Sequence, residues 1–537
     1  MPGTLYYNGK IYTADDDRSF AEAFAVENGR FSFVGKEAAI EEYEVRVDLQ
    51  GKCVIPGLID SHCHLFAGIT MTAMNFSNVD PSTKPGELGP LLKELLDSAD
   101  LPEGKVFPVI GIDLTAGDFS ASDIDKYIND RPVVVFSLDG HALLLNSRAM
   151  ECVGIRKDTE DPSEDSYYVR DDKGNPTGLV IEIPAMRACY ELMNNTPENI
   201  DEVILDIANE YAARGYTGVF EAMSFDDEDT GRLEALKSLD EKGLLPLRLS
   251  MSFGYNGEEF LSAEETLRIM KRNRAEFSSE NLFNNTLKII ADGTVEERSA
   301  LLAEPYADDG ESFGSQLVST EDMKKASELA AKEGFSVHIH AIGDRAVSRV
   351  IDVLSSLGSI SGTKTIAHNQ LYTGTDIERM IKEKDIFFQT TPQWMASDEH
   401  TLKCLGEERF GRQFPVGSMQ RGGVTVTFGS DSCLEPETAD AFTGMFYACA
   451  RGDETLCGSE YLPPETESIS RAESLKAYTI NCAKQLMLDK ETGSISEGKS
   501  ADFVIVDRDI MNCPLEELKN TQVISTFFRG RKTFTAD

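Results

Sequence analysis

Short apolar runs separated by turn residues recur at both ends of this chain, and none of them has a helical period. Examples are residues 23–26 and 31–34 near the start, and residues 501–506 and 523–528 near the end. Apolar or alternating runs of this length between turn residues are typical of β-strands. Two β-rich ends that enclose a long middle therefore predict one small sheet domain assembled from both termini.

In the middle of the chain, strand-like apolar runs alternate with helical segments such as residues 320–334. The runs are residues 216–220, 287–290, 335–340, 365–368, 386–389 and 424–428. This alternation predicts a parallel α/β architecture, which we interpret as a (β/α)8 TIM-like barrel. In such a barrel the chemistry gathers at the C-terminal ends of the strands, where several of these runs carry polar or ionisable residues.

One interval is too long for a bare barrel. The stretch from His64 to Tyr216 is several times the length of one βα repeat, and it contains a strand-like run at 132–136 and a turn-rich segment at 171–176. We interpret it as a large insertion after the first strand, with a fold of its own, near the mouth of the barrel.

The length and composition allow more than one core, since the chain has 537 residues of which 41% are hydrophobic. We expect a composite β-sandwich domain made of residues 1–55 with 485–537. We expect the barrel to span residues 56–484 and to include the inserted subdomain at about 80–200.

The charge balance narrows the choice of partners. The net charge is −40, from 92 acidic and 52 basic residues, and it would repel phosphate backbones and anionic membranes. No apolar run approaches the ~20 residues that cross a bilayer, the opening residues lack a secretory signal, and the ten cysteines form no Cys-x-x-Cys pair. We expect a cytoplasmic protein with reduced thiols and a small-molecule substrate, without nucleic acid or membrane; a homodimer stays open.

The first candidate for chemistry is the pair His62 and His64, which follows the apolar run 54–59. Side chains at i and i+2 of a strand leave the same face, so both imidazoles point to one place and can hold a metal. Cys63 faces the other way, which disfavours a thiolate nucleophile.

Further candidates lie at or near the ends of later apolar runs, or inside one in the case of Lys288. They are Lys288, His340, His368 and Asp431. Imidazole and carboxylate ligands without a thiolate suit a divalent metal such as zinc, with iron or manganese as alternatives.

With these residues in place, the chain resembles the amidohydrolase superfamily, and within it the YtcJ-like group, also called amidohydrolase family 3. The resemblance runs almost from end to end. The matching segments are PGLIDSHCHL (56–65), DGHALLLNSRAM (139–150), LKIIADG (287–293), VHIHAIGDRAV (337–347), IAHNQL (366–371), FGSDSCLEP (428–436) and GSISEGKSADFVIVD (493–507).

The resemblance implies a role for each candidate. The first strand supplies His62 and His64, the fifth His340, the sixth His368 and the eighth Asp431, all as metal ligands. Lys288 occupies the position of a strand-four lysine that is N-carboxylated and bridges two metals in binuclear relatives. Two readings stay open: a carboxylated Lys288 between two ions, or a packed or salt-bridged Lys288 beside one ion.

These residue types also suggest how a bond would be hydrolysed. A bound metal lowers the pKa of water from about 15.7 to about 7 and polarises a carbonyl. Asp431 can then act as general base and general acid in turn. His368 or His340 would bind a second metal or hydrogen-bond the carbonyl oxygen.

We therefore expect a metal-dependent hydrolase of a non-peptide carbon–nitrogen bond, acting on a linear amide such as an N-substituted formamide or a small N-acyl compound. The alternative within the same chemistry is a deaminase or cyclic-amide hydrolase. The alternative from another class is a catalytically silent protein that keeps the fold as a scaffold.

Three other polar residues have two readings each. His141 either faces the substrate or stabilises a turn, and Asp292 either caps the turn that follows it or contacts the substrate. His338 shares the face of His340 but lies roughly 6.6 Å deeper along the strand, at about 3.3 Å per residue. We expect it to be a hydrogen-bonded histidine of the barrel interior rather than a ligand.

Overall fold

The computed structural model describes residues 3–536 with short gaps. The gaps are residues 37–42, 74–75, 100, 103, 116, 138–139, 164–165, 183–184, 187–188, 190–191, 193–198, 225–230, 397, 433–438 and 453–461. The chain forms two compact units, one made of Met1–Phe66 with Ile204–Asp537 and the other of Ala67–Val203. None of the helices in the described residues has the length and apolar character that crossing a bilayer requires.

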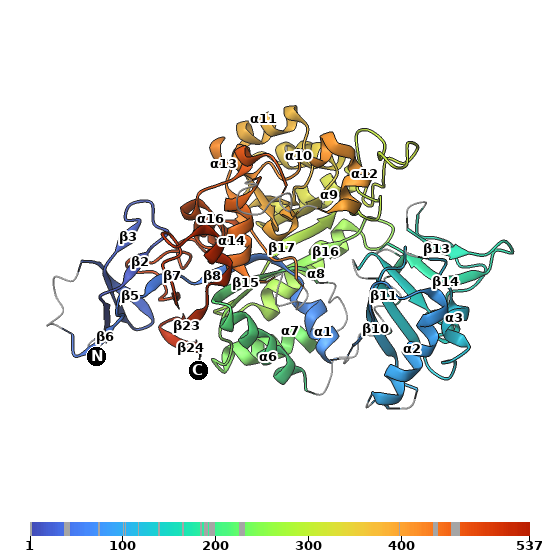
Figure 1. The fold of residues 1–537 in the computed structure, drawn as a ribbon, viewed down its shortest axis with the longest axis horizontal. Helices are drawn as coiled ribbons and strands as arrows, with labels where there is room; N and C mark the ends of the chain where they lie inside the picture. The colour runs from blue at the N-terminus through green and yellow to red at the C-terminus, as the bar shows by residue number, and fades with distance from the viewer. Residues whose placement is uncertain are drawn as a thin grey trace. The chain divides into compact units, whose positions relative to one another are not determined.

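The first unit is built on an eight-stranded parallel sheet (Figure 1). Its order is β21-β20-β19-β18-β17-β16-β15-β8, so each strand neighbours the next barrel strand along the chain. The strands are β8 (Leu58–Cys63), β15 (Tyr216–Ser224), β16 (Arg248–Tyr255), β17 (Leu282–Ile290), β18 (Ser336–Ala341), β19 (Lys364–His368), β20 (Ile386–Thr390) and β21 (Val426–Phe428). Nearly every residue in them is buried, as expected for a parallel sheet covered on both faces. The predicted α/β barrel is confirmed.

The two outer strands of this sheet meet through the segment that follows β21. The Asp431 N–H donates to the carbonyl oxygen of His62 at 2.7 Å, and the His64 N–H donates to the carbonyl oxygen of Ser432 at 3.0 Å. Gly429 permits this approach, because a Cβ atom there would lie 2.5 Å from the backbone nitrogen of His62. The chain thus closes the ring of strands at the end where β8 carries its histidines.

Helices connect the barrel strands, and several begin at capping residues that the sequence supplies. Ser262, Ser319 and Thr373 accept hydrogen bonds from the backbone N–H of Glu265, Asp322 and Asp376, at 3.2, 3.1 and 3.2 Å. The helices around the barrel are α6 (Ile200–Ala213), α7 (Gly231–Glu241), α8 (Ala263–Phe277), α9 (Thr320–Lys332), α10 (Asp344–Ser356), α11 (Gly374–Glu383), α12 (Glu399–Phe410), α13 (Val416–Arg421), α14 (Ala441–Ala450), α16 (Arg471–Ala477) and α17 (Ile480–Gln485).

Strands from both ends of the chain form a further sheet in the same unit, as the blue and red strands of Figure 1 show. Its order is β24-β23-β22-β7-β2-β3, with β2 (Lys10–Tyr12), β3 (Phe20–Ala21), β7 (Cys53–Pro56), β22 (Phe503–Val506), β23 (Val523–Phe528) and β24 (Arg531–Thr535). A four-stranded sheet, β5-β4-β1-β6, contains β1 (Thr4–Tyr7), β4 (Ala23–Glu27), β5 (Arg30–Gly35) and β6 (Val45–Asp48).

Aromatic rings from both termini pack together beside these sheets. Phe503 stacks on Phe527 with ring centroids 4.2 Å apart, and Tyr6 stacks on Phe24 at 4.9 Å. Such pairs add to the stability gained from buried area alone. The domain boundaries at residues 55 and 485 stay predictions.

The second unit, Ala67–Val203, has a six-stranded sheet of order β13-β14-β12-β11-β10-β9. Its strands are β9 (Ser77–Asn78), β10 (Phe107–Ile112), β11 (Val133–Ser137), β12 (Ala142–Leu145), β13 (Tyr167–Arg170) and β14 (Pro176–Ile181), and its helices include α2 (Pro85–Ser98), α3 (Ala121–Asp125) and α4 (Ser147–Val153). Buried apolar clusters form around this sheet, including Val109, Val133 and Leu144 in one and Val134, Leu143 and Val180 in another. A location near the barrel mouth stays a prediction.

Candidate functional site

The end of β8 brings two imidazoles to one carboxylate. Nε2 of His62 lies 3.4 Å from Oδ1 of Asp431, and Nε2 of His64 lies 3.0 Å from the same oxygen. Between them, Cys63 points elsewhere and its Sγ donates to the carbonyl of Phe220 at 3.4 Å. Burial raises the pKa of the Cys63 thiol well above its usual value, so the thiolate is disfavoured.

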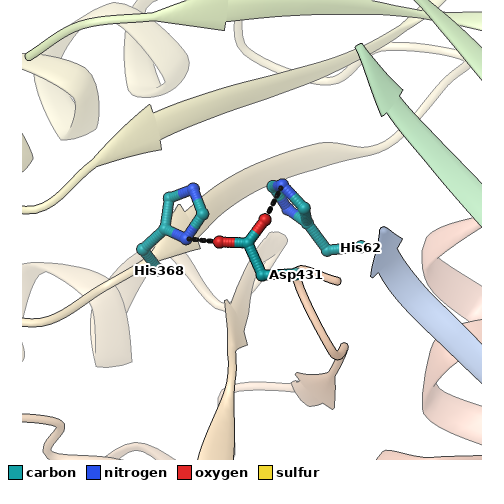
Figure 2. A group of neighbouring side chains, drawn as sticks. All are labelled: His62, His368 and Asp431. Atoms are coloured by element: carbon teal, nitrogen blue, oxygen red, sulfur yellow. Dashed lines mark ion pairs between the residues drawn. The ribbon is translucent and has the colours of Figure 1, made fainter. Parts of the chain in front are cut away.

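The other oxygen of Asp431 faces His368, the last residue of β19. Oδ2 lies 3.5 Å from Nδ1 of His368. Figure 2 shows the carboxylate between the rings of His62 and His368, and one ligand atom from each of these three residues lies within 4.8 Å of the others. They come from three separate strand ends, which is how a barrel assembles a site.

This group has the properties that a divalent cation requires. Nδ1 of His368 and Oδ1 of Asp431 are buried, and neither has a hydrogen-bond partner among the described residues. Burial lowers the pKa of His62 and His368 well below the usual value, so both imidazoles are neutral, the form that binds metal. The donor set of imidazole nitrogens and a carboxylate suits zinc and similar ions.

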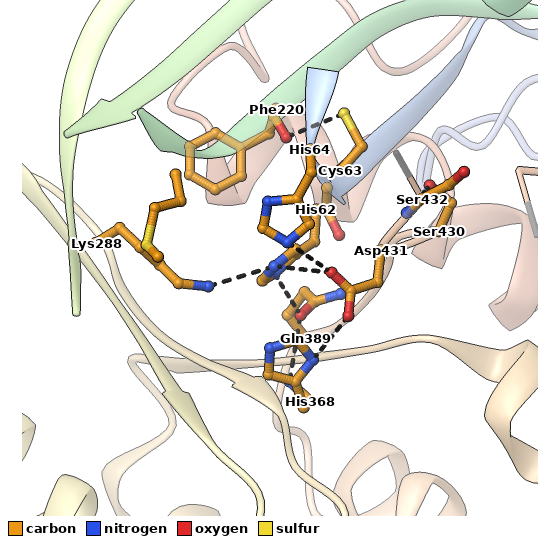
Figure 3. Close-up of polar contacts among 12 residues, drawn as sticks. His62, Cys63, His64, Phe220, Lys288, His368, Gln389, Ser430, Asp431 and Ser432 are labelled. Atoms are coloured by element: carbon orange, nitrogen blue, oxygen red, sulfur yellow. Dashed lines mark hydrogen bonds and ion pairs between the residues drawn. The ribbon is translucent and has the colours of Figure 1, made fainter. Parts of the chain in front are cut away.

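Lys288 approaches the same cluster from another strand. Its Nζ lies 3.3 Å from Nε2 of His62, and Figure 3 shows Lys288 and Asp431 on opposite sides of that ring. The lysine is 2% exposed, and burial lowers its pKa to about 8 against the opposing effects of Asp431 and Glu221. A larger share of neutral amine is thereby available than on a solvated lysine.

His340 lies at the edge of the cluster. Its ring centroid is 4.3 Å from that of His368, while its Nε2 lies 3.3 Å from the carbonyl of Gly293 and 3.6 Å from Oδ1 of Asp292. The structure therefore joins His340 to the group through ring contact with His368, whereas Asp431 contacts His62, His64 and His368 directly.

Asp292 lies next to His340, but its carboxylate accepts hydrogen bonds from backbone N–H groups. Its carboxylate accepts hydrogen bonds from the N–H groups of Leu301, Ile342 and Gly343 at 2.8, 3.0 and 2.8 Å. These bonds tie the segment after β17 to the segment after β18. This geometry supports the turn-capping reading of Asp292, and a substrate contact stays a prediction.

His141 belongs to the second unit, where it pairs with a buried glutamate. Its Nδ1 lies 2.9 Å from Oε2 of Glu182, and the Glu182 N–H donates to the His141 carbonyl at 2.9 Å. Both contacts join β12 to the end of β14, which supports the turn-stabilising reading. Two parts of the predicted motifs, Asp139 and residues 433–436, lie outside the described residues.

Two side chains contact the far nitrogen of His62. Nε2 of His338 lies 3.0 Å and Oε1 of Gln389 lies 3.1 Å from Nδ1 of His62. His338 is 1% exposed, so the predicted hydrogen-bonded interior position is confirmed. A proton on Nδ1 that is donated to Gln389 leaves the lone pair of Nε2 directed toward Asp431, the tautomer that a metal ligand needs.

The sequence interpretation missed Gln389 and two buried acids. Oδ1 of Asp60 accepts from the N–H groups of His62 and Ser430, at 3.1 and 3.0 Å, and thereby joins β8 to the segment that carries Asp431. Burial raises the pKa of Asp60 to about 6 and that of Glu221, on β15, to about 7. A charged residue inside an otherwise apolar strand was the signal that could have revealed both acids.

The backbone is strained at the same place. His368 and Asp431 adopt φ values of 70° and 55°, in the left-handed region that non-glycine residues rarely occupy. Asn369, with φ of 55°, holds its turn through a hydrogen bond from Nδ2 to the carbonyl of Gln389 at 2.7 Å. Strained residues cluster at functional sites, where the surrounding contacts stabilise them.

Comparison with known proteins identifies the family. The sequence model described as the amidohydrolase family matches residues 46–534. The chain belongs to the amidohydrolase family. That match spans all eight barrel strands and includes His62, His64, His368 and Asp431, whereas strands β1 to β5 precede it. The resemblance inferred from the motifs is confirmed.

Three relatives align with most of the chain. It is 30% identical over 440 residues to the "Exoenzymes regulatory protein AepA" of Pectobacterium carotovorum subsp. carotovorum, covering 79% of this chain and 93% of that protein. It is 26% identical to the "Putative amidohydrolase YtcJ" of Bacillus subtilis, covering 98% of each. It is 28% identical to the "N-substituted formamide deformylase" of Arthrobacter pascens, covering 99% of this chain and 98% of that protein.

A solved structure supports the fold as well. An uncharacterized metal-dependent hydrolase from Pyrococcus horikoshii matches with a TM-score of 0.72 and 22% identity, covering 96% of this chain and 99% of that one. At this identity the likeness shows the fold alone.

Proposed function

We propose that this amidohydrolase is a metal-dependent hydrolase of a carbon–nitrogen bond outside peptides, and that its substrate is a linear amide, either an N-substituted formamide or a small N-acyl compound. The observation that carries the proposal is the position of Asp431. Its carboxylate lies within 3.0 to 3.5 Å of nitrogens from three histidines, His62, His64 and His368.

His62, His64, His368 and Asp431 are the residues proposed to hold the metal, with His340 and Lys288 at the edges of the group. Zinc is the proposed ion, with iron or manganese as alternatives, and either one or two ions are compatible with the donor set. When bound, a divalent metal supplies an activated water and polarises the carbonyl under attack.

The remaining chemistry falls to the side chains. Asp431 accepts a proton from the attacking water through one carboxylate oxygen and returns it to the nitrogen of the leaving amine. Water oxygen bonds to the carbonyl carbon, the carbon–nitrogen bond breaks, and a carboxylate and an amine result. His340, whose ring contacts that of His368, is proposed to donate to the carbonyl oxygen as charge develops there.

The choice of a linear amide is supported by the Arthrobacter pascens relative, whose alignment covers 99% of this chain. The name of the AepA relative, a regulatory protein, agrees with the silent-scaffold alternative. A silent scaffold does not need metal ligands, whereas here three imidazoles and one carboxylate converge, and this arrangement supports an enzyme.

A substrate panel tests the proposal. Purified protein is stripped with a chelator, reloaded with zinc, iron or manganese, and assayed on formamides, N-acyl amino acids, hydantoins and aminopurines. We expect amine release from the linear amides in the reloaded protein and none in the stripped protein. Turnover confined to ring substrates would replace the linear amide with a deaminase or cyclic-amide activity, and failure to retain any metal would favour the silent scaffold.

A further inference from the structure

The chain has a single tryptophan, Trp394, and it is partly exposed to solvent. Trp394 lies in the short 3-10 turn η2 (Pro392–Met395) that follows β20. Pro392 and Met395 are buried, whereas Trp394 is 36% exposed. An exposed apolar side chain on a segment at the C-terminal end of a barrel strand is placed where substrates enter.

The turn that carries Trp394 is anchored on both sides. The Trp394 N–H donates to the Thr391 carbonyl at 3.1 Å, and the Leu462 N–H donates to the Met395 carbonyl at 3.0 Å. Nε2 of Gln393 donates to the carbonyl of Asp440 at 3.0 Å. These hydrogen bonds hold in place the backbone of the turn that carries the indole.

One face of the indole contacts the proposed metal site. The ring of Trp394 stacks on the ring of His368 with centroids 5.4 Å apart and an interplanar angle of 13°. Nδ1 of His368 lies in turn 3.5 Å from Asp431. The indole is thus in direct ring contact with a proposed metal ligand while the residue stays partly exposed.

We infer that Trp394 is a specificity-determining residue whose exposed surface binds a flat, apolar substituent on the nitrogen of the amide. The inference rests on the proposed function. A formyl group carries no side chain, so the nitrogen substituent is the only part of a formamide large enough to reach the indole. Stacking between flat rings adds to apolar burial, so an aromatic substituent binds better than a puckered alkyl ring of similar size, by about threefold to tenfold.

A binding measurement tests this without turnover. Because Trp394 is the only tryptophan, selective excitation of indole reports on this position alone. Metal-loaded protein is titrated with benzylamine and with cyclohexylmethylamine, which represent the amine products. We expect benzylamine to change the emission at about threefold to tenfold lower concentration. Equal half-saturation by both amines, or no response to benzylamine, would overturn the inference.

Kinetics provide the second test, using N-benzylformamide and N-(cyclohexylmethyl)formamide with Trp394→Leu and Trp394→Phe. We expect the ratio of the two kcat/KM values to fall in Trp394→Leu to about one, and Trp394→Phe to restore most of it. Phe20→Leu is the matched control, since Phe20 is an aromatic residue, 45% exposed, in β3 of the terminal sheet. Its ratio should equal that of the wild type.

The outcomes separate the two proposals. An equal slowing of both formamides in Trp394→Leu would show that the indole only orients His368, and would overturn the inference. Discrimination between the two amines without hydrolysis of any amide would support the subsite and reject the proposed function. If Trp394→Leu does not fold, as judged by circular dichroism and metal content, the Phe variant and the amine titration decide.

Discussion

Asp431 contacts His62 twice, once through its backbone and once through its side chain. Its N–H donates to the His62 carbonyl at 2.7 Å, and its Oδ1 lies 3.4 Å from Nε2 of the same histidine. The hydrogen bond that closes the barrel thereby also sets the carboxylate beside the imidazole. The contact that closes the barrel therefore also assembles the site.

Asp431→Asn separates the two contacts, since it keeps the backbone bond and changes the side chain. Asparagine is nearly isosteric but is a poor proton acceptor, so we expect the fold to persist and kcat to fall by at least ~10² if Asp431 shuttles the proton. Steady-state kinetics, circular dichroism and metal content provide the measurements. Asp172→Asn, in an exposed turn, is the control. Near-normal rates would remove Asp431 from the proton transfer.

Gln389 is expected to control metal affinity through His62. Its Oε1 lies 3.1 Å from Nδ1 of His62 and accepts from the N–H of His368 at 3.3 Å. Gln389→Leu removes this acceptor, and loss of such a partner typically lowers metal affinity by about 10- to 100-fold. Competition with a chromophoric chelator measures the change, with the exposed Gln522→Leu as control. Unchanged affinity would indicate that His338 alone holds the His62 proton.

The part of the site that follows from local geometry was predictable from the sequence. Alternation along β8 places His62 and His64 on one face, and the structure brings both Nε2 atoms to Asp431. The approach of Asp431 could not come from spacing, because barrel closure alone brings it to β8. The family resemblance pointed to Asp431, whereas Gln389 and Trp394 had no motif to reveal them.

In the fold, too, elements set by local sequence were predictable, and an element that depends on distant contacts was not. The apolar runs predicted seven of the barrel strands, counting β8, but they gave no sign of β16 (Arg248–Tyr255). That strand begins with Arg248 and carries Ser250 and Ser252, so it is not an apolar run. The arginine is buried because Asp502, from the end of the chain, pairs with it. A charge neutralised by a partner so far along the sequence cannot be recognised as core in advance.

Glu221 predicts a pH dependence of stability in the metal-free protein. Burial raises its pKa from 4.5 to about 7. Because the folded-state pKa is raised, the protonated form of Glu221 contributes fully to the free energy of unfolding below pH 4.5. This contribution is lost as the pH rises through about 7. The free energy of unfolding of the wild type relative to Glu221→Gln should therefore fall across this window, by about 3 kcal/mol in total.

Urea unfolding at several pH values between 4 and 8 measures this difference. The control is Glu276→Gln, an exposed glutamate of α8, for which the difference from wild type should stay flat. The absolute stability of Glu221→Gln is not the readout, because Glu221 also accepts from the N–H groups of Phe66 and Met223 at 2.6 and 2.9 Å. A difference that stays constant with pH would show that Glu221 is already ionised when buried.

Gly429→Ala should disturb the site through the backbone. The added Cβ would lie 2.5 Å from the His62 nitrogen and 2.8 Å from its Cβ, so the segment after β21 has to move away from β8. Overpacking of this kind costs about 1–3 kcal/mol, and the displacement carries Asp431 with it. We expect a lower thermal midpoint together with weaker metal retention. Gly374→Ala, where an added Cβ meets no atom within 4 Å, should change neither.

Carboxylation of Lys288 is expected to determine whether the site binds one metal ion or two. Its Nζ lies 3.3 Å from His62 Nε2, and with a pKa lowered to about 8, about a tenth of the amine is neutral at pH 7. Only the neutral amine reacts with carbon dioxide to form a carbamate, which would add a second anionic group beside the imidazoles. We expect metal-loaded wild type to retain two ions per chain and Lys288→Met to retain at most one.

Elemental analysis after gel filtration gives the stoichiometry, and a carbamate signal from ¹³C-labelled bicarbonate identifies the modified lysine. Lys364→Met is the matched control, because Lys364 is also buried in a barrel strand but its Nζ pairs with Asp385 at 2.6 Å, away from the histidines. It should lose stability and keep its metal. One ion in both wild type and Lys288→Met, without a carbamate signal, would establish the mononuclear reading, in which Lys288 is a packed neighbour of His62.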